Sequence, residues 1–316
     1  MLRKMLYRKI MVASSLLLVI LMLYFIPSYQ DDVVITEKLE YVYPNNEMVI
    51  YLLDQDDYVS RTLLPVSQTS VVESASDLVE GMLVDGRKHN ILPKGFKPLL
   101  PRDTKVLKMS LNNGVLMIDF SKEFNNVKEE YEEKLIEALT YTLTSVKGIE
   151  KIEIYVEGKK LTMLPNSKKK LPEYLDKSYG INKSYEMTSL NEIDAYTVYY
   201  VSNTMDDAYY IPVTKYVNNN EKQDKIEIII DELSTNLIYE SNLASYLDMN
   251  AKMLDYEIIN DQVRINFNDK ILSNITDSVI LEEVMYTIGL SLCDELGVSS
   301  VVFEVNNQEI TTFNLE

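Results

Sequence analysis

The sequence predicts an α+β protein with two tandem copies of one domain, each a mostly antiparallel sheet covered by two helices on one face, after one N-terminal transmembrane helix. A long internal repeat and an apolar run near the N-terminus carry this prediction. Pro65 and Phe120 in the first copy match Pro212 and Phe267 in the second, both at an offset of 147 residues. A repeat of this length is a whole domain rather than one unit of a solenoid.

A second match gives a slightly different offset. The Tyr-Thr pairs at 141–142 and 286–287 lie 145 residues apart, which we interpret as the effect of a shorter loop in the second copy. No set of residues typical of catalysis repeats at either offset.

The apolar run covers residues 10–26, 17 residues without a charge. As a helix it would be about 26 Å long, the short end of a bilayer crossing. Four basic residues and no acidic ones precede it, so the charge bias places the N-terminus in the cytoplasm. We predict a cytoplasmic segment at 1–9, a signal anchor at 10–26 and a stalk at 27–46. A cleaved signal peptide is the alternative, although residues 25–30 offer no good cleavage site.

Composition limits what the remaining part of the chain can bind. The whole chain has a net charge of −18, and residues 31–316 carry 27 basic and 49 acidic side chains, a net charge of −22. Such a surface repels nucleic acid and anionic lipid headgroups. One cysteine, Cys293, permits no intramolecular disulfide, so each copy must be stabilised by its own hydrophobic core.

The first copy, at residues 47–164, alternates hairpins with helices. Ser70 followed three residues later by Glu73 is a capping box and predicts the start of a helix. Asn112, Asn113 and Gly114 predict a tight turn between two strands. From these signals and the apolar periodicity, we expect strands at 48–53 and 58–66, a helix over 70–82, strands at 105–111 and 115–120, a helix over 131–146 and a strand at 152–156.

The second copy, at residues 195–316, repeats this order. We expect strands at 196–201 and 209–213, a helix opened by Asp224 and Glu227, strands at 252–259 and 263–267, a helix over 280–292 and a strand at 301–305. Because hairpins dominate, two helices on one face of a mostly antiparallel sheet are the natural arrangement. Residues 165–194 between the copies are rich in polar residues and predict a linker, although 161–164 could add one strand to the first sheet.

Several segments together resemble the GerM domain family. They are LLPVS at 63–67 and YIPVT at 210–214, LPRDTKVL at 100–107, GVLMIDFSKEF at 114–124, YTLT at 141–144 and GIEKIEIYVEG at 148–158. The resemblance spans residues 47–313 and is weaker in the second copy, where Asp248 stands at the position of Pro101. It implies tandem domains behind an export signal and a role in sporulation or germination. It implies no established enzymatic activity and transfers no site residues. The lipid-attachment cysteine of the founding member is absent, which again favours a transmembrane anchor.

No combination of side chains predicts catalysis. His89 is the single histidine, and the sequence places no carboxylates around it, so an ordinary loop residue is expected. Asp54, Asp56 and Asp57 lack the glycine and distal glutamate of a calcium loop and predict a solvated turn. Cys293 lies in an apolar helix, where cysteine behaves as a small hydrophobe. We therefore predict a protein that is not an enzyme and has no metal or cofactor.

Tyrosine is abundant, with 23 residues, and tryptophan is absent. Five tyrosines gather on one predicted hairpin of the second copy: Tyr196, Tyr199, Tyr200, Tyr209 and Tyr210. They suit half-buried strands and could simply pack the sheet. The alternative is an interaction surface for a partner, because such rings are enriched at interfaces. A basic cluster, Lys168 to Lys170, predicts either a solvated linker or contact with an anionic cell-wall polymer.

We predict a membrane-anchored extracytoplasmic scaffold or assembly protein of the bacterial envelope, single-pass, with its N-terminus cytoplasmic and both domains outside. Its partners would be other envelope proteins, the membrane through the N-terminal helix and cell-wall polymer, and not nucleic acid. Two alternatives remain open. A cell-wall hydrolase would need two carboxylates about 5 to 9.5 Å apart with a raised pKa on one of them. A small-ligand-binding protein would need an apolar pocket between the domains.

Overall fold

The computed structural model describes residues 47–66, 70–202, 209–235 and 242–315. Residues 46–316 form one compact unit. The predicted cytoplasmic segment, signal anchor and stalk lie outside the described residues. Within the described ranges, no helix is both long and apolar enough to cross a bilayer.

The first repeat begins with a hairpin and ends with a four-stranded sheet. Its elements are β1 (Glu47–Leu53), β2 (Val59–Pro65), α2 (Val71–Gly81), β3 (Val106–Asn112), β4 (Val115–Phe120), α3 (Glu132–Thr144), β5 (Lys151–Val156) and β6 (Lys159–Lys160). Short 3-10 turns lie at His89–Ile91, Lys122–Asn126 and Glu129–Tyr131. The predicted capping box is present, since the Ser70 hydroxyl accepts from the Glu73 backbone N–H at 3.2 Å and donates to its carboxylate at 3.0 Å.

The second repeat follows the same plan with additions. After a 3-10 turn at Lys177–Tyr179, its elements are β7 (Ser184–Tyr185), β8 (Ile193–Ser202), β9 (Tyr209–Asn218), α4 (Lys225–Thr235), β10 (Leu243–Ala244), β11 (Met253–Ile259), β12 (Gln262–Phe267), a 3-10 turn at Asp269–Ile271, β13 (Leu272–Asn274), β14 (Val279–Ile280), α5 (Glu282–Leu296), β15 (Ser300–Val305) and β16 (Gln308–Asn314).

The two sheets have the same strand order, β3-β4-β5-β6 and β11-β12-β15-β16, which confirms two copies of one fold. In each sheet the outer pairings are antiparallel, as expected, and the central pairing, β4 with β5 or β12 with β15, is parallel. A helix crosses the sheet between the two central strands and returns the chain to the end where it started, so the second strand must run in the same direction as the first.

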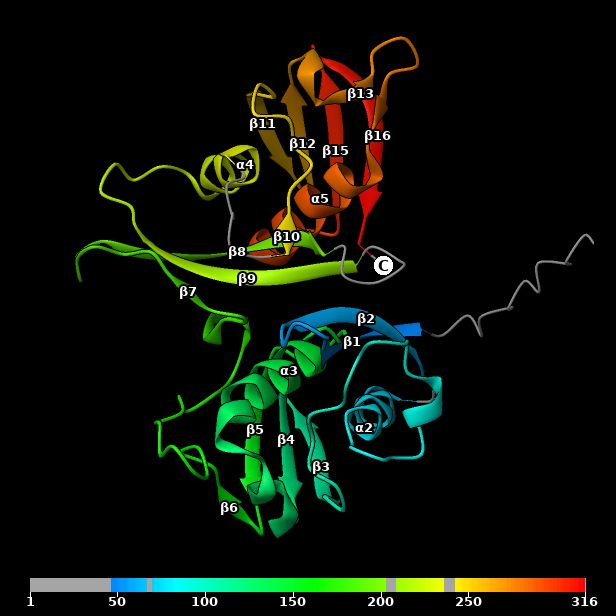
Figure 1. Cartoon of the computed structure of the whole chain (residues 1–316), viewed down its shortest axis with the longest axis vertical. Coiled ribbons are helices and arrows are strands. Elements are labelled where there is room, and N and C mark those ends of the chain that lie inside the picture. The colour runs from blue at the N-terminus through cyan, green and yellow to red at the C-terminus, as the bar shows by residue number, and fades with distance from the viewer. Residues whose placement is uncertain (1–46, 67–69, 203–208, 236–241, 316) are drawn as a thin grey trace, which may run out of the picture. The chain divides into compact units, whose positions relative to one another are not determined.

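The leading hairpin does not join the sheet, which corrects the single sheet that the sequence suggested. The pair β1 and β2 forms a separate sheet, as does the pair β8 and β9 with the short β7 and β10 at its edges. Helix α3 lies between hairpin and sheet, and α5 is placed in the same way in the second repeat (Figure 1). These helices are therefore buried on two faces. The single apolar stripe expected from the sequence covers only part of the buried surface of α3, because Ile136, Thr140 and Tyr141 are buried as well.

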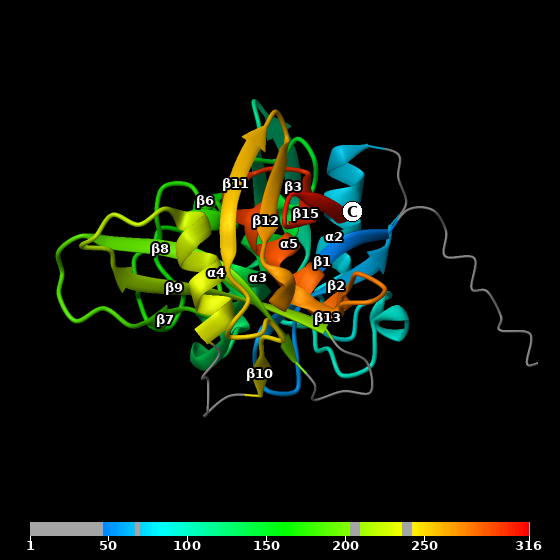
Figure 2. The same cartoon turned by 90° about the horizontal axis from the view of Figure 1, so that it is seen from above.

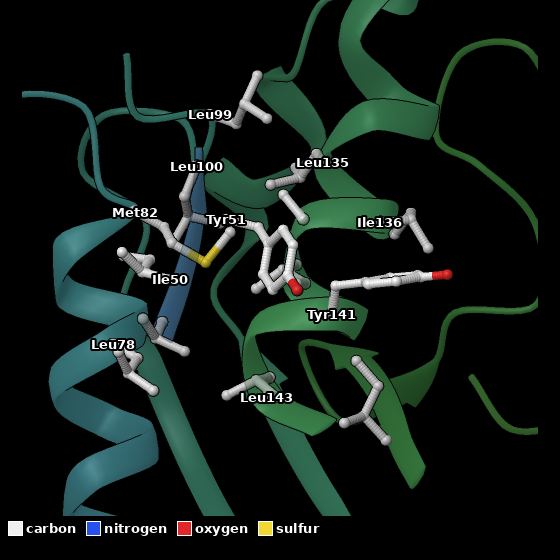
Figure 3. Close-up of a cluster of buried hydrophobic side chains, with 14 of the residues drawn as sticks. Ile50, Tyr51, Leu78, Met82, Leu99, Leu100, Leu135, Ile136, Tyr141 and Leu143 are labelled. Carbon is white, nitrogen blue, oxygen red and sulfur yellow. The ribbon is translucent and has the colours of Figure 1, made fainter. Parts of the chain in front are cut away.

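Each repeat has its own hydrophobic core. In the first, Ile50 and Tyr51 of the hairpin meet Leu78 and Met82 of α2 and Leu135 of α3 (Figure 3). At roughly 1.5 to 3 kcal/mol for each fully buried large apolar side chain, such cores stabilise the protein without a disulfide. The Phe120 and Phe267 match holds, because both rings end equivalent central strands and are fully buried.

The structure corrects the register of the second pair of helices. Gly148 and Gly297, 149 residues apart, follow α3 and α5 with positive φ angles of 97° and 68°. Thr142 and Ser291, also 149 apart, each accept a hydrogen bond from the hairpin. The predicted offset of 145 is wrong by four residues. Four residues make about one helical turn, so the apolar stripe looks the same in both registers.

The segment between the repeats is part of the fold rather than a free linker. Leu175 and Ile181 are buried in the first core. Leu175 pairs with Ile152 of β5 in the way that Phe313 of β16 pairs with Val301 of β15. The connecting segment therefore completes the sheet of the first repeat, because β6 itself ends after two residues.

Candidate functional site at the interface between the repeats

The two hairpins pack against each other, with β2 beside β9 (Figure 1). At their contact the hydroxyl groups of Tyr51 and Tyr199 lie 2.9 Å apart. The two tyrosines are equivalent, since the backbone N–H of Tyr51 donates to Thr142 and that of Tyr199 to Ser291, each at 2.9 Å. Equivalent residues meet in this way at a two-fold dimer interface, and here the arrangement occurs within one chain. Because Tyr51 pairs with Arg61 and Tyr199 with Pro212, the residue that matches Pro212 in this register is Arg61, and the predicted match with Pro65 is wrong.

A buried chain of hydrogen bonds continues from this contact. Tyr199 donates to the Asp294 carboxylate of α5 at 3.0 Å, so Tyr51 must be the donor in the tyrosine pair. Lys177 of the connecting segment forms an ion pair with the same carboxylate. Burial, and then the charge of Asp294, raises the pKa of Tyr199 well above its ordinary value. The interface therefore joins both repeats and the connecting segment through protonated tyrosines.

Asp54, at the turn of the first hairpin, makes a second polar contact across the interface. Its carboxylate is fully buried and accepts from the backbone N–H groups of Asp56 and Tyr58, from the Ser60 hydroxyl at 2.8 Å and from the Tyr209 hydroxyl at 3.1 Å. Burial raises its pKa, and these hydrogen bonds oppose the rise. With four donors already in place, this carboxylate cannot also serve as a calcium ligand.

Asn182 of the connecting segment holds the two hairpins together. Its side-chain amide donates to the backbone carbonyls of Val59 and Pro212, both at 2.8 Å, and its oxygen accepts from the Val59 N–H at 2.9 Å. Nothing in the sequence around Asn182 distinguished it from other polar linker residues. Its role follows from its position between β2 and β9.

The predicted tyrosine surface faces this chain and not solvent. Tyr196, Tyr199, Tyr200 and Tyr209 are at most 8% exposed, and Tyr210 is partly buried. Tyr200 donates to Glu232 at 2.7 Å, and Tyr210 stacks on Tyr286 with ring centroids 5.2 Å apart. The first four rings have too little exposed area to contact a second molecule. At these four positions the expected interaction surface is replaced by packing in the second core and by the contact with the first repeat, and Tyr210 alone of the five is partly exposed.

A cleft of about 600 Å³ opens beside the tyrosine pair. Charged and polar groups from both repeats line it, among them Tyr51, Arg61, Lys147, Tyr199, Cys293 and Asp294. Apolar side chains line it as well, among them Val49, Leu290, Val298 and Leu315, so the cleft combines charged and apolar surface. Burial, followed by the charge of Asp294, raises the pKa of Cys293 to about 12, so its thiol stays protonated and is a poor nucleophile.

The other sequence candidates lie apart from the interface or form no site. His89 is exposed in a short 3-10 turn of the first repeat. In the described ranges, no group of three or more His, Cys, Asp or Glu side chains is arranged to hold a metal ion. Lys168, Lys169 and Lys170 are exposed, and Lys169 contacts the Glu133 carboxylate at 2.6 Å. Contact of this cluster with wall polymer stays a prediction.

One pair of carboxylates meets part of the requirement for a hydrolase. Glu133 and Glu137, one turn apart on α3, both bond to Lys183, at 2.7 Å and 3.1 Å. Burial raises the pKa of Glu137, whereas the pKa of Glu133 is lowered because its bonds to Lys169 and Lys183 outweigh burial. The Glu137 side chain is only 4% exposed, and its second oxygen accepts from the Asn182 N–H at 3.0 Å. Glu137 therefore attaches the connecting segment to α3 and has no free oxygen for a substrate.

Comparison with known proteins agrees with the repeat architecture. The chain matches the Germane family, described as "Sporulation and spore germination", over residues 49–162 and again over 197–311. The chain belongs to this family. It is 34% identical over 267 residues to the spore germination protein GerM of Bacillus subtilis (strain 168), covering 82% of this chain and 71% of that protein.

A solved structure of the tandem GerMN domains of the sporulation protein GerM from Bacillus subtilis has the same architecture. The two structures agree with a TM-score of 0.77 at 29% identity, over 85% of this chain and 96% of the other. The family resemblance predicted from the sequence is confirmed. The family is not known for enzymatic activity.

Proposed function

We propose that this protein is a membrane-anchored, extracytoplasmic scaffold of the bacterial envelope that acts in sporulation or germination without catalysing a reaction. Family membership supports the biological process. The interface between the repeats is the observation that carries the scaffold role. It fixes two domains to each other through buried side chains of both hairpins and of the connecting segment. A rigid pair of domains presents two surfaces at a constant spacing, which suits an assembly protein.

The same geometry argues against a hydrolase as the alternative. The carboxylates with raised pKa values at Asp54 and Glu137 are buried and fully hydrogen-bonded within the chain. Cys293 is a protonated thiol, and His89 lies exposed in a short 3-10 turn. Asp231 and Glu227, one turn apart on α4, differ from these groups, because both are exposed and the pKa of Asp231 is raised by partial burial and then by the charge of Glu227.

Complementation of a deletion strain in the native host tests the scaffold role. We expect His89→Ala, Cys293→Ser, Asp56→Asn and Asp57→Asn to retain nearly full function. Removal of residues 195–316 should abolish function even when the first repeat is exported. Immunoblots of surface-exposed protein provide the matched control for amount. Loss of function in one of the point variants, together with an active truncation, would show a local chemical site and refute the scaffold.

The membrane anchor needs a separate experiment, because residues 1–46 lie outside the described part of the chain. We propose an uncleaved helix at 10–26, supported by the charge bias and the poor cleavage site. The protein should remain in the membrane fraction after high-salt washing, with an intact N-terminus by mass spectrometry. A mature N-terminus between Pro27 and Asp32 would show a cleaved signal peptide instead.

A further inference from the structure

Each four-stranded sheet ends in a strand with a free side. Strands β3 and β11 have one neighbouring strand each among the described residues, β4 and β12 (Figure 1). Figure 2 shows β11 beside β12 at the front of that view. On the free side of an edge strand, alternate backbone N–H and C=O groups point outward and can pair with another strand. The two edges occupy equivalent positions in the two repeats, 147 residues apart.

Both edges expose large apolar side chains. Leu107 of β3 is 50% exposed, and on β11 Leu254 and Ile258 are 53% and 50% exposed. Natural proteins usually protect such edges with charges, because exposed apolar edge strands promote pairing with other chains. Within the strands themselves, the charged residues have one sign on each edge, although a lysine precedes both strands, Lys105 before β3 and Lys252 before β11.

The charges on the two edges are opposite. Lys105 precedes β3 and Lys108 lies on it, whereas Asp255 and Glu257 lie on β11. Lys108 and Glu257 are exposed, and neither forms an ion pair within the described residues. The arginine opposite Glu257, Arg264, bonds instead to Glu304 and Glu309. Lys108 lies opposite Asp119 of β4 without forming an ion pair with it, so an edge of the other kind can offer each charge a further partner.

We propose that β3 of one copy of this chain pairs antiparallel with β11 of a second copy. With Lys108 opposite Glu257, Ser110 stands opposite Asp255, and Met109 meets Tyr256. Met109 and Tyr256 lie on the core side of their sheets, because their partners Ile118 and Ile265 are buried. The two sheets then join with their helices on the same face. Lys252 falls beside Asn113 in this register, away from the lysines of β3.

The charges also select which edges pair. Two β3 edges would place lysines against each other, and two β11 edges would place carboxylates against each other, so pairing of identical edges is disfavoured. When β3 of one copy pairs with β11 of a second copy, the β11 edge of the first and the β3 edge of the second remain free. Further copies can therefore add, and the assembly does not stop at a dimer. The inference rests on the two edges alone and does not depend on the proposed role in sporulation.

Sedimentation velocity of purified residues 46–316 tests the pairing across a wide concentration range. This compact unit contains both cores, so it can be studied without the N-terminal segment. The wild type should associate reversibly, and hydrogen exchange in β3 and β11 should slow with concentration. Lys108→Glu and Glu257→Lys should each weaken association about ten-fold, because an attractive cross-strand pair becomes repulsive. Lys159→Glu on β6 and Glu221→Lys in a loop change the same charges elsewhere and should have no effect.

Charge exchange separates the proposed contact from misfolding. The double variant Lys108→Glu with Glu257→Lys should associate like the wild type. An equimolar mixture of the two single variants should associate more tightly than either variant alone. A wild type that stays monomeric at every concentration would refute the pairing. Association that neither single variant weakens, or that the double variant does not restore, would refute it equally.

Discussion

Helix α3 of the first repeat carries Thr140 at a buried position where α5 of the second repeat carries Gly289. The neighbouring strand compensates. Phe313 lies so close to Gly289 that a β-carbon there would be 2.4 Å from the ring. Its counterpart in the first repeat is the smaller Leu175, contributed by the connecting segment. The two repeats thus keep one backbone arrangement. The first has the larger side chain on the helix, and the second has the larger side chain on the strand, so that each interior remains closely packed.

The hairpins differ in a second way. Strands β1 and β2 have 7 residues each, whereas β8 and β9 have 10. The longer hairpin carries the tyrosine cluster and supplies Tyr199 and Tyr209 to the contact with the first repeat. Both repeats provide aromatic side chains to the interface, since Phe96 of the first repeat meets the Tyr209 ring edge-to-face with centroids 5.3 Å apart. The first repeat also provides the carboxylate of Asp54 and the turn around it.

The largest expected effect is a loss of stability at alkaline pH, caused by the buried tyrosines of the β8–β9 hairpin. Burial raises the pKa of Tyr200, and raises that of Tyr209 to about 12, against about 10 in an unfolded chain. Stability is fully present below pH 10 and is lost as pH rises through the folded values. Above pH 10, each tyrosine that stays protonated in the folded state lowers the free energy of unfolding by about 1.4 kcal/mol per pH unit. Urea unfolding between pH 10 and 12 should show that the free energy of unfolding falls less steeply with pH in Tyr200→Phe than in the wild type. An unchanged slope would contradict the raised pKa of Tyr200.

Exchange of the buried helix residue tests the volume comparison. Gly289→Thr places the residue of the first repeat against Phe313 and should lower the free energy of unfolding by about 3 kcal/mol through overpacking. Adding Phe313→Leu should recover part of this loss, because the smaller side chain resembles Leu175. Chemical denaturation of the single and double variants measures the coupling. Strictly additive losses would mean that the two positions are independent.

Removal of the shared asparagine should affect both repeats together. Asn182→Ala deletes three side-chain hydrogen bonds, two to Val59 and one to Pro212, and we expect a loss of about 2 kcal/mol. Asn90→Ala, at an exposed position, is the matched control and should change stability by less than about 0.5 kcal/mol. Protection of β2 and β9 amides in hydrogen exchange should fall together. A loss confined to one hairpin would argue against a joint contact.

The tyrosine pair should show the smallest and most asymmetric effect. Tyr199→Phe removes the bond to the charged Asp294 carboxylate and also the oxygen that accepts from Tyr51, and should destabilise by about 2 kcal/mol. Tyr51→Phe removes only the neutral bond between the tyrosines and should destabilise by about 1 kcal/mol. A double-mutant cycle by urea denaturation measures their coupling. Equal losses from the two variants would show that the donor order from Tyr51 to Tyr199 to Asp294 is wrong.

Most local elements could be predicted from the sequence because their signals are local. The capping box at Ser70, the turn at Gly114 and the alternating strand at 152–156 each depend on neighbouring residues, and each lies where it was expected. The helix register could not be predicted, because a shift of four residues returns an apolar stripe to the same face. The positions of Gly148 and Gly297, which follow equivalent helices, were the sequence signal that indicates the correct register.

The sequence by itself determined the duplication, the α+β class, the family and the absence of a disulfide, since each depends on residue identity and spacing along the chain. The tertiary structure decided where the hairpins lie, which strands run parallel and what the polar residues contact. Tyr51 in an apolar strand, Asn182 in a polar segment and Asp294 near a helix end look unremarkable in sequence, yet they meet at one interface. Their roles arise from contacts between residues up to 148 positions apart, and side-chain periodicity within one element holds no information about such contacts.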